Sequence, residues 1–419
     1  MVSSTVTSAS ALASASRARV GISLFFFTNG AFFAGMLPRY PEVKHSLELS
    51  NTAFGLAIVA FPLGAMSASM LPSLFIRKIG ARMTALLWTV VLGAFMCLAA
   101  IGAQTGAVWL FVGSYFVAGL SDAIVDTGQN SHAMRVQEAY GRSIINSLHA
   151  LWSAGSIVGG LLGTAAAALA VPIAVHIGVV SAACIALAVY ATDLCKLPER
   201  ERRAWREPRA SPGGTARSRV WTLMPLAIIG IASMQVEVVG MDWSANYMNG
   251  PVGWSVRDAG VAYVVLMASQ FAGRLVGDPA TDRWGRLRVA RGGMAMVAVG
   301  LVLAAVVPVA WAALGGFALV GFGCATLVPA TFAAADAAPG FEDGTALTAV
   351  SWFMRIGTIF ASPAVGVIGD AFSLRLGILL PLVLGSVAWF YLSRLERVRP
   401  DEAVSTALAA EEARDGAGG

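Results

Sequence analysis

The chain has 419 residues, of which 57% are hydrophobic and only 13% are charged, whereas a soluble domain carries roughly a quarter charged residues. This composition excludes an ordinary water-soluble domain, and the net charge of +5 then reports membrane orientation, so no nucleic-acid partner is expected. The apolar residues form runs of about twenty, long enough to cross a hydrocarbon core of about 30 Å as helices. Backbone groups in lipid must be paired within their own segment, and the runs show no strand-like alternation. We therefore predict an all-α membrane protein embedded in the lipid bilayer.

Twelve transmembrane helices are predicted, six before and six after a hydrophilic segment rich in Arg, Pro and Gly. In chain order they are expected at residues 20–38, 52–74, 83–102, 107–132, 144–168, 172–193, 221–247, 259–277, 289–309, 311–334, 345–369 and 372–394. The predicted organisation is a disordered cytoplasmic tail (1–19), an N-terminal six-helix bundle (20–194), a basic cytoplasmic linker (195–220), a C-terminal six-helix bundle (221–395) and a second disordered cytoplasmic tail (396–419).

The positions of Lys and Arg predict the orientation of these helices. Most of the 29 Lys and Arg residues lie in cytoplasmic segments if both termini are cytoplasmic, as the positive-inside rule requires. The first sixteen residues are uncharged, so no cleavable signal peptide is expected. The four Cys residues lie in different apolar runs without ligand spacing, so neither a metal nor a cofactor is expected. We predict a multi-pass, monomeric protein of the plasma (inner) membrane.

The two halves of the sequence resemble each other. At an offset of 205 residues the matches around the second helix of each half are Ser50 with Ser255, Gly55 with Gly260, Lys78 with Arg283, and Gly80 with Gly285. Weak internal symmetry of this kind is typical of transporters built from repeats, which place their site near the membrane midplane where the repeats meet.

A tight loop follows the eighth predicted helix, from Gly277 to Arg286, with the sequence GDPATDRWGR. Its D-R-x-G-R core resembles the signature loop of the major facilitator superfamily. That resemblance implies the major facilitator fold, two pseudo-symmetric six-helix bundles that rock around a central site. It also implies a conformational latch. Arg274 lies four residues before Asp278 and near the cytoplasmic face, so we expect either a local latch pair with Asp278 or snorkelling toward that face. The residues implied for this latch are Arg274, Asp278, Asp282, Arg283, Gly285 and Arg286. In the corresponding first-half loop, Arg77 stands where the family has Asp.

The fourth predicted helix carries a polar stripe. Asp122, Asp126 and Asn130 are spaced four residues apart, so they share one helix face. A carboxylate in the membrane interior costs at least roughly 2.5 to 3.5 kcal/mol and usually marks an ion or substrate path. We interpret Asp122 and Asp126 as proton-coupling residues and Asn130 as a substrate-binding residue; the alternative is a structural pair near the cytoplasmic rim.

The segment from Asp126 to Asn130, with sequence DTGQN, also resembles the fourth helix of the fucose-permease-like branch of the superfamily. In that branch the acid is the protonation site for sugar/proton symport, a role that would fall on Asp126. The sequence departs from the branch on the first helix, where Ala34 occupies the position at which the family places a second acid.

Other polar residues within apolar runs are further candidates. Glu237 on the seventh helix is predicted to contact the proton or the substrate, whereas Asp242 lies nearer the periplasmic end, where a solvated carboxylate is unremarkable. Arg355 lies deep in the eleventh helix and should pair with a membrane carboxylate or an anionic substrate. The substrate-binding candidates are Asn29, Asn130, His149, Trp152, Gln235 and Arg355.

The predicted function is secondary active transport of a small solute by alternating access, coupled to protons. Symport of a sugar-like substrate is favoured over a proton-driven efflux antiporter for drugs or metabolites. An enzyme is not expected, because the chain has neither an H-E-x-x-H nor a G-x-S-x-G motif. Two alternatives of other classes stay open, an intramembrane enzyme that uses paired aspartates and a transporter-like sensor.

Overall fold

The computed structural model describes residues 2–68, 71–142, 144–197, 216–307, 309–336, 338 and 345–395, and every regular element within these ranges is a helix. The first half contains α1 (Val2–Met36), η1 (Leu37–Arg39), α2 (Tyr40–Ser46), α3 (Asn51–Ile58), α4 (Ala60–Ser67), α5 (Leu71–Ile79), α6 (Ala81–Gln104), α7 (Val108–Tyr140), α8 (Ile145–Ala168) and α9 (Ile173–Leu194). The second half contains α10 (Ala216–Asn249), α11 (Val261–Trp284), α12 (Arg286–Val306), α13 (Ala310–Cys324), α14 (Leu327–Asp336), α15 (Thr345–Ile359), α16 (Ala361–Ala371), α17 (Leu374–Gly377), α18 (Leu380–Tyr391) and η2 (Leu392–Leu395).

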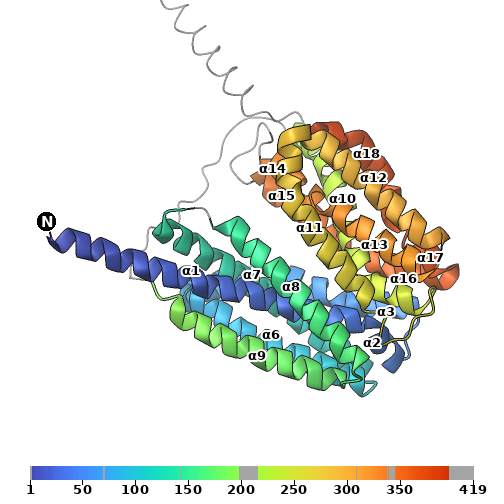
Figure 1. Cartoon of the computed structure of the whole chain (residues 1–419), viewed down its shortest axis with the longest axis horizontal. Coiled ribbons are helices and arrows are strands. Elements are labelled where there is room, and N and C mark those ends of the chain that lie inside the picture. The colour runs from blue at the N-terminus through green and yellow to red at the C-terminus, as the bar shows by residue number, and fades with distance from the viewer. Residues whose placement is uncertain are drawn as a thin grey trace, which may run out of the picture.

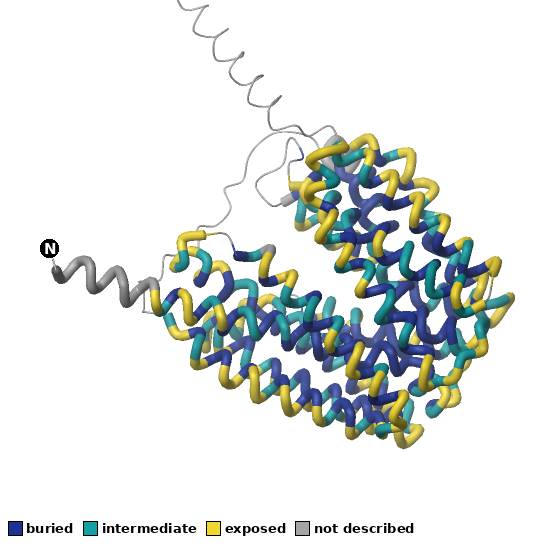
Figure 2. Tube along the Cα trace, viewed as in Figure 1, coloured by how far each residue is buried: buried dark blue, intermediate teal, exposed yellow. Residues whose placement is uncertain are grey.

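These helices form two bundles, one from each half of the chain. α1 packs on α8 and α6 on α7 in the first bundle, and α11 and α12 both pack on α13 in the second. Figure 1 shows the bundles meeting at one end and diverging toward the other, where α9 finishes and α10 begins. We call the first the joined end and the second the linker end. The buried side of each helix faces its own bundle, and exposed residues cover the outside (Figure 2).

The helices are long and apolar enough for a membrane. Among the described residues, ten helices could each cross a bilayer by length and composition, or eleven if the bent pair of Asn51–Ser67 and Leu71–Ile79 is one span. The remaining predicted span is α11, which is long enough but carries Gln270, Arg274 and Asp278. Large apolar side chains such as Trp109 and Trp311 are about 86% and 85% exposed, as expected for surfaces that face lipid. The predicted all-α membrane fold is confirmed.

Four of the predicted spans are interrupted, at 52–74, 311–334, 345–369 and 372–394. The breaks precede a proline by two to four residues: Val59 before Pro62, Ala325 and Thr326 before Pro329, Phe360 before Pro363, and Ile378 and Leu379 before Pro381. Proline donates no backbone hydrogen bond, and its ring collides with the carbonyl four residues earlier, so the helix bends there. Because the bends re-aim the segments that follow, they shape the space between the bundles.

The N-terminal segment was predicted to be a disordered tail over residues 1–19, and this prediction is wrong for the described part, because α1 begins at Val2. The first twenty residues contain no Gly or Pro, so nothing interrupts a helix there. Ala15 and Ala18 are fully buried, and the Ser14 hydroxyl donates to the Lys196 carbonyl at 3.3 Å. The linker is also shorter than predicted, since α10 begins at Ala216; residues 198–215 and the C-terminal tail 396–419 lie outside the described residues.

Glycines let helices of the first bundle touch backbone to backbone. A Cβ on Gly119 of α7 would lie 1.9 Å from the Phe61 carbonyl oxygen of α4, whereas a Cβ on Gly113 of the same helix would meet nothing within 4 Å. We expect Gly119→Ala to force α4 and α7 apart and to destabilise the fold by at least about 1 to 3 kcal/mol. Gly113→Ala is the matched control and should leave the thermal unfolding temperature of purified protein unchanged. Equal unfolding temperatures for both variants would contradict this packing.

The joined end is held by contacts between α3 and α16. The Asp370 carboxylate accepts hydrogen bonds from the backbone N–H groups of Asn51, at 2.9 Å, and Thr52, at 2.7 Å, while the Ser50 side chain caps the next free amide of α3. A negative charge at the positive end of a helix is favourable. A Cβ on Gly55 would lie 2.5 Å from the Ser362 carbonyl oxygen, so the two helices also touch closely. The halves are therefore closed against each other at this end.

Candidate functional site

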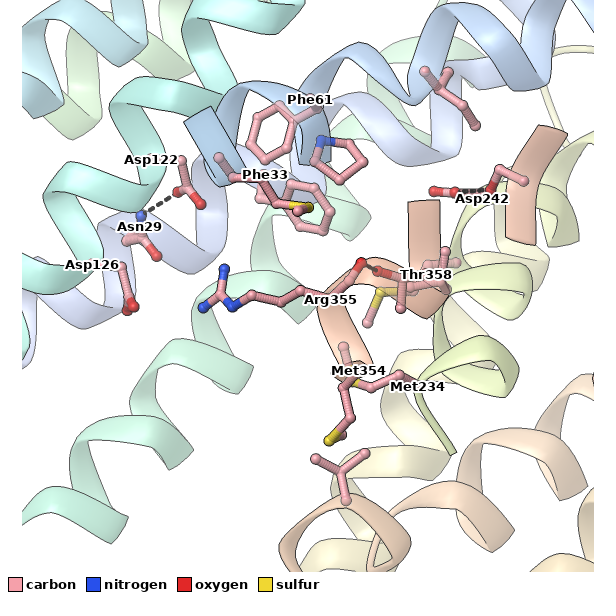
Figure 3. A pocket seen from close by; sticks show the side chains of 18 of the residues that line it. Asn29, Phe33, Phe61, Asp122, Asp126, Met234, Asp242, Met354, Arg355 and Thr358 are labelled. Atoms are coloured by element: carbon pink, nitrogen blue, oxygen red, sulfur yellow. Dashed lines mark hydrogen bonds between the residues drawn. The ribbon is translucent and has the colours of Figure 1, made fainter. Parts of the chain in front are cut away.

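A cavity of about 650 Å³ lies between the bundles. Its walls come from α1, α2, α3, α4, α7 and α8 of the first half and from α10, α11, α14, α15 and α16 of the second. Figure 3 shows carboxylates of the first half on one side and Arg355 of the second half reaching toward them. The predicted site residues that line the cavity are Asn29, Asp122, Asp126, His149, Trp152, Arg274 and Arg355. The structure thus brings residues from both halves to one shared cavity.

The first-half wall is built around Asn29 of α1. Its amide nitrogen donates to Oδ1 of Asp122 on α7 at 2.7 Å, and its amide oxygen accepts from the indole Nε1 of Trp152 on α8 at 2.8 Å. Indole nitrogen can only donate and a carboxylate can only accept, so these two partners fix the orientation of the amide. Three helices are thereby linked through one side chain, which holds the Asp122 carboxylate at the cavity surface.

Asp126 lies one helical turn beyond Asp122 and is also held by amides. The Asn130 side-chain nitrogen donates to the Asp126 carboxylate at 2.9 Å, and Gln129 donates to it at 3.4 Å. Asn130 was predicted to bind substrate, but it is not among the cavity-lining residues. Its described contacts are with Asp126, so it acts on the cavity by orienting that carboxylate.

Arg355 projects from α15 into the cavity opposite these acids (Figure 3). Its positive charge acts on both Asp122 and Asp126. Among the described residues, no carboxylate oxygen lies within 4.0 Å of an Arg355 nitrogen, the distance limit for an ion pair. A guanidinium in the membrane interior is costly without a partner, so the space between Arg355 and the two aspartates suits a polar solute that can bridge them.

Arg274 of α11 joins the two halves across the cavity. One of its nitrogens donates to the Ser153 hydroxyl of α8 at 2.8 Å, and another lies 3.5 Å from the Glu237 carboxylate of α10. The sequence grouped Arg274 with the latch of the following loop, with Asp278 as its partner. The structure places its side chain at the cavity instead, because α11 points this residue toward α8 and α10.

The other latch residues lie at the linker end of α11 and the start of α12. Gly285 has a φ of +82°, which supports the predicted tight turn, since this backbone region favours glycine. Asp278, Asp282 and Arg283 are exposed, and none of them forms an ion pair with another described residue. In this conformation the linker ends are apart, and the latch stays a prediction.

Two predicted binding residues have contrasting surroundings. His149 lines the cavity and packs edge-on against the Phe26 ring, with ring centroids 5.3 Å apart. Gln235 is 8% exposed and its amide donates to the Gly357 carbonyl of α15 at 3.3 Å, outside the cavity lining. Gln235 therefore joins α10 to α15, and only His149 is placed to meet a solute.

Asp242 lines the cavity, whereas the sequence predicted an ordinary solvated carboxylate nearer the periplasmic end. In the structure it lies at the joined end of the cavity and accepts a hydrogen bond from the Ser362 hydroxyl of α16. The hydroxyls of Tyr40 and Tyr115, 2.7 Å apart, line the same region. Residue depth alone could not reveal this, because the cavity lining depends on how helices of both halves pack. The pairing of an acid with a following Trp inside an apolar run was the available signal.

Comparisons with known proteins agree with this architecture. Residues 226–414 match the sequence model of the Major Facilitator Superfamily. An uncharacterized MFS-type transporter of Yersinia pestis is 27% identical over 359 residues, covering 85% of this chain and 90% of its own length. The nucleoside transporter NupG superposes with a TM-score of 0.67 at 12% identity, covering 91% of this chain and 100% of its own. FucP in its outward conformation superposes with a TM-score of 0.62 at 14% identity, covering 91% and 99%.

The chain therefore has the major facilitator fold, and these findings support a multi-pass membrane transporter of this type. The narrower resemblance to the fucose-permease-like branch is not singled out, because FucP is one of several structural neighbours, which also include a nucleoside transporter and a D-xylose-proton symporter.

Proposed function

We propose that this chain, a protein with the major facilitator fold, is a secondary active transporter that moves a small polar solute by alternating access and couples the movement to protons. The observation that carries the proposal is the cavity between the halves, where Asp122 and Asp126 of the first half face Arg355 of the second (Figure 3). The charged groups of the two halves can be bridged by a solute only while both halves surround it. Binding then favours the closed intermediate that alternating access requires.

Proton coupling is proposed on the two aspartates. Both are held by neutral amides of their own bundle, and neither forms an ion pair with a described residue. A carboxylate in this setting is neutralised most simply by a proton, which removes the cost of a charge in the membrane interior. Arg355 supplies the opposite charge for the ionised state. A proton can therefore be exchanged as the distance between the halves changes.

The solute is proposed to be sugar-like, carrying several hydroxyl groups. The cavity offers acceptors at Asp122 and Asp126 and a donor fork at Arg355, together with the aromatic faces of Phe33 and Phe61. Hydroxyl groups can both donate to carboxylates and accept from a guanidinium. We place the joined end toward the outside and the linker end toward the cytoplasm, the orientation that the distribution of Lys and Arg favours.

A thermal-shift screen of purified protein against sugars, organic acids and antibiotics identifies a solute first, because a ligand of the folded state raises its stability. The protein is then reconstituted in de-energised vesicles, with the binding solute added outside. Uptake with protons predicts that the external medium becomes more alkaline. Acidification of the external medium would favour the proton-driven exporter, and solute movement without any pH change would reject proton coupling.

A further inference from the structure

Asp242 of α10 lies at the part of the cavity nearest the joined end, apart from Asp122 and Asp126 (Figure 3). Its carboxylate accepts a hydrogen bond from the Ser362 hydroxyl. The ion pairs found among the described residues, within 4.0 Å, are Arg39 with Glu42, Lys196 with Asp193, and Arg274 with Glu237, and none involves Asp242. Among the described residues, the Asp242 carboxylate therefore has a hydrogen bond from one hydroxyl and no cation in an ion pair with it.

The groups that face Asp242 from the packed helices are hydroxyls, not charges. Tyr40 of α2 and Tyr115 of α7, whose hydroxyls are 2.7 Å apart, line the same cavity as Asp242, and the buried Tyr263 hydroxyl of α11 has no hydrogen-bond partner among the described residues. α16 contributes the Ser362 hydroxyl, and Phe54 of α3 packs against the neighbouring Trp243. On its own helix the next acid is Glu237, which is engaged with Arg274.

The residues that adjoin Asp242 also form the closed contact between the halves. Trp243, the next residue, is fully buried and packs edge-on against Phe54 of α3, with ring centroids 5.5 Å apart. Ser362, the hydrogen-bond partner of Asp242, also lies close to Gly55 of α3. A Cβ added to Gly55 would lie 2.5 Å from the Ser362 carbonyl oxygen. Parting of the joined end would separate both residues from α3, and the carboxylate between them would then meet water on that side.

We propose that Asp242 is a second proton-binding carboxylate of the transport cycle, open to the outside when the joined end parts and to the cavity in the conformation described here. It rests on the proposed proton-coupled function and extends it to a residue on the second half. A proton from external water converts the carboxylate to a carboxylic acid, and cavity water on the linker side later takes the proton away. Ser362 can donate to the ionised form or accept from the protonated form, so its hydrogen bond persists through both.

The protonation state of Asp242 should decide whether the joined end closes. Closing the joined end removes the carboxylate from external water without offering a cation, so the charged form opposes closure and the neutral form permits it. Acid should therefore favour a closed joined end. The variant Asp242→Asn mimics the neutral form in nearly the same shape, and it should stay closed at every pH.

The test measures the distance between spin labels at Thr105→Cys and Val309→Cys, two exposed positions at the joined end of the two halves, in full-length protein whose native Cys residues are replaced. In the otherwise unchanged protein, the fraction with separated labels should fall as the buffer is made acidic. Asp242→Asn and Asp242→Ala should lose this response, and Asp242→Glu should keep it. Asp258→Asn, at an exposed aspartate of the same end, is the matched control and should respond normally.

The variant Asp370→Asn separates this role of Asp242 from the hydrogen bonds between Asp370 and the first turn of α3. It should raise the separated fraction at every pH while keeping the response to acid. The inference is overturned if Asp242→Asn responds normally, if Asp370→Asn abolishes the response, or if the unchanged protein shows none. The proposed function fails separately: a normal response of the joined end in a protein that moves no protons with its solute would reject proton-coupled transport alone.

Discussion

Replacing Asp126 by Asn should reduce solute-driven proton movement to background while exchange of labelled solute across the membrane continues. Asparagine has nearly the same shape as Asp and keeps an oxygen that Asn130 and Gln129 can donate to, but it cannot bind a proton. Exchange needs only binding and the rocking of loaded protein, whereas net coupled uptake needs the empty carrier to return after releasing its proton. The measurement compares external pH and counterflow in the same vesicles.

Asp193→Asn is the control for this experiment. Asp193 forms an ion pair with Lys196 at the end of α9 and does not line the cavity, so both assays should give unchanged values. Proton movement at the normal ratio to solute in Asp126→Asn would remove Asp126 from the coupling mechanism. If that role falls on Asp122, the same two assays on Asp122→Asn will show it.

Replacing Arg355 by Ala should weaken solute binding by roughly 30-fold or more, since truncating one partner of a charged hydrogen-bonded pair that the bound solute buries costs about 2 kcal/mol or more. Arg355→Lys keeps the charge but loses the planar fork, so its binding should fall between those of Ala and Arg. Affinity for the solute found by thermal shift is measured by calorimetry on purified protein.

Arg375→Ala tests whether charge alone explains the effect of Arg355. Arg375 is exposed in α17 at the joined end, so its loss changes the net charge equally without touching the cavity. We expect wild-type affinity for that variant. Equal affinities for Arg355→Ala and the wild type would show that the guanidinium does not contact solute. The space between Arg355 and the aspartates would then be needed for the movement of the two bundles and not for binding of solute.

The matched glycines show what sequence could predict about the fold. Gly80 and Gly285, aligned by the internal repeat, have φ values of +81° and +82° and each precedes the next long helix. Gly55 and Gly260 both lie where the halves touch, against Ser362 and Pro38. A positive φ and a close contact between helices both require glycine, so both appear in the sequence as matched Gly residues. The twelve predicted spans and their division into two halves could therefore be predicted from the residue pattern alone.

The site was only partly predictable, because side-chain direction depends on where the helices bend. The stripe of Asp122 and Asp126 came from helical spacing, and the depth of Arg355 came from counting residues. Asp242 was misjudged because counting gave its depth and could not give the cavity beside it. Gln235 and Asn130 were polar and deep, yet each serves a neighbouring group. Polarity in a membrane helix marks a need for a partner, and sequence does not say which partner supplies it.

The seam between α3 and α16 joins a carboxylate to backbone amides, and this chemistry makes it reversible. Each of these hydrogen bonds has a net worth of only about 1.5 to 3 kcal/mol, since water can replace either side. An apolar contact of equal area would resist hydration and would stay closed once formed. Here Asp370 and the first turn of α3 can both be hydrated after separation, so the polar part of this contact leaves no group without a partner, and the apolar part is the Phe54–Trp243 contact. In the proposed transport cycle, the joined end can therefore part and form again.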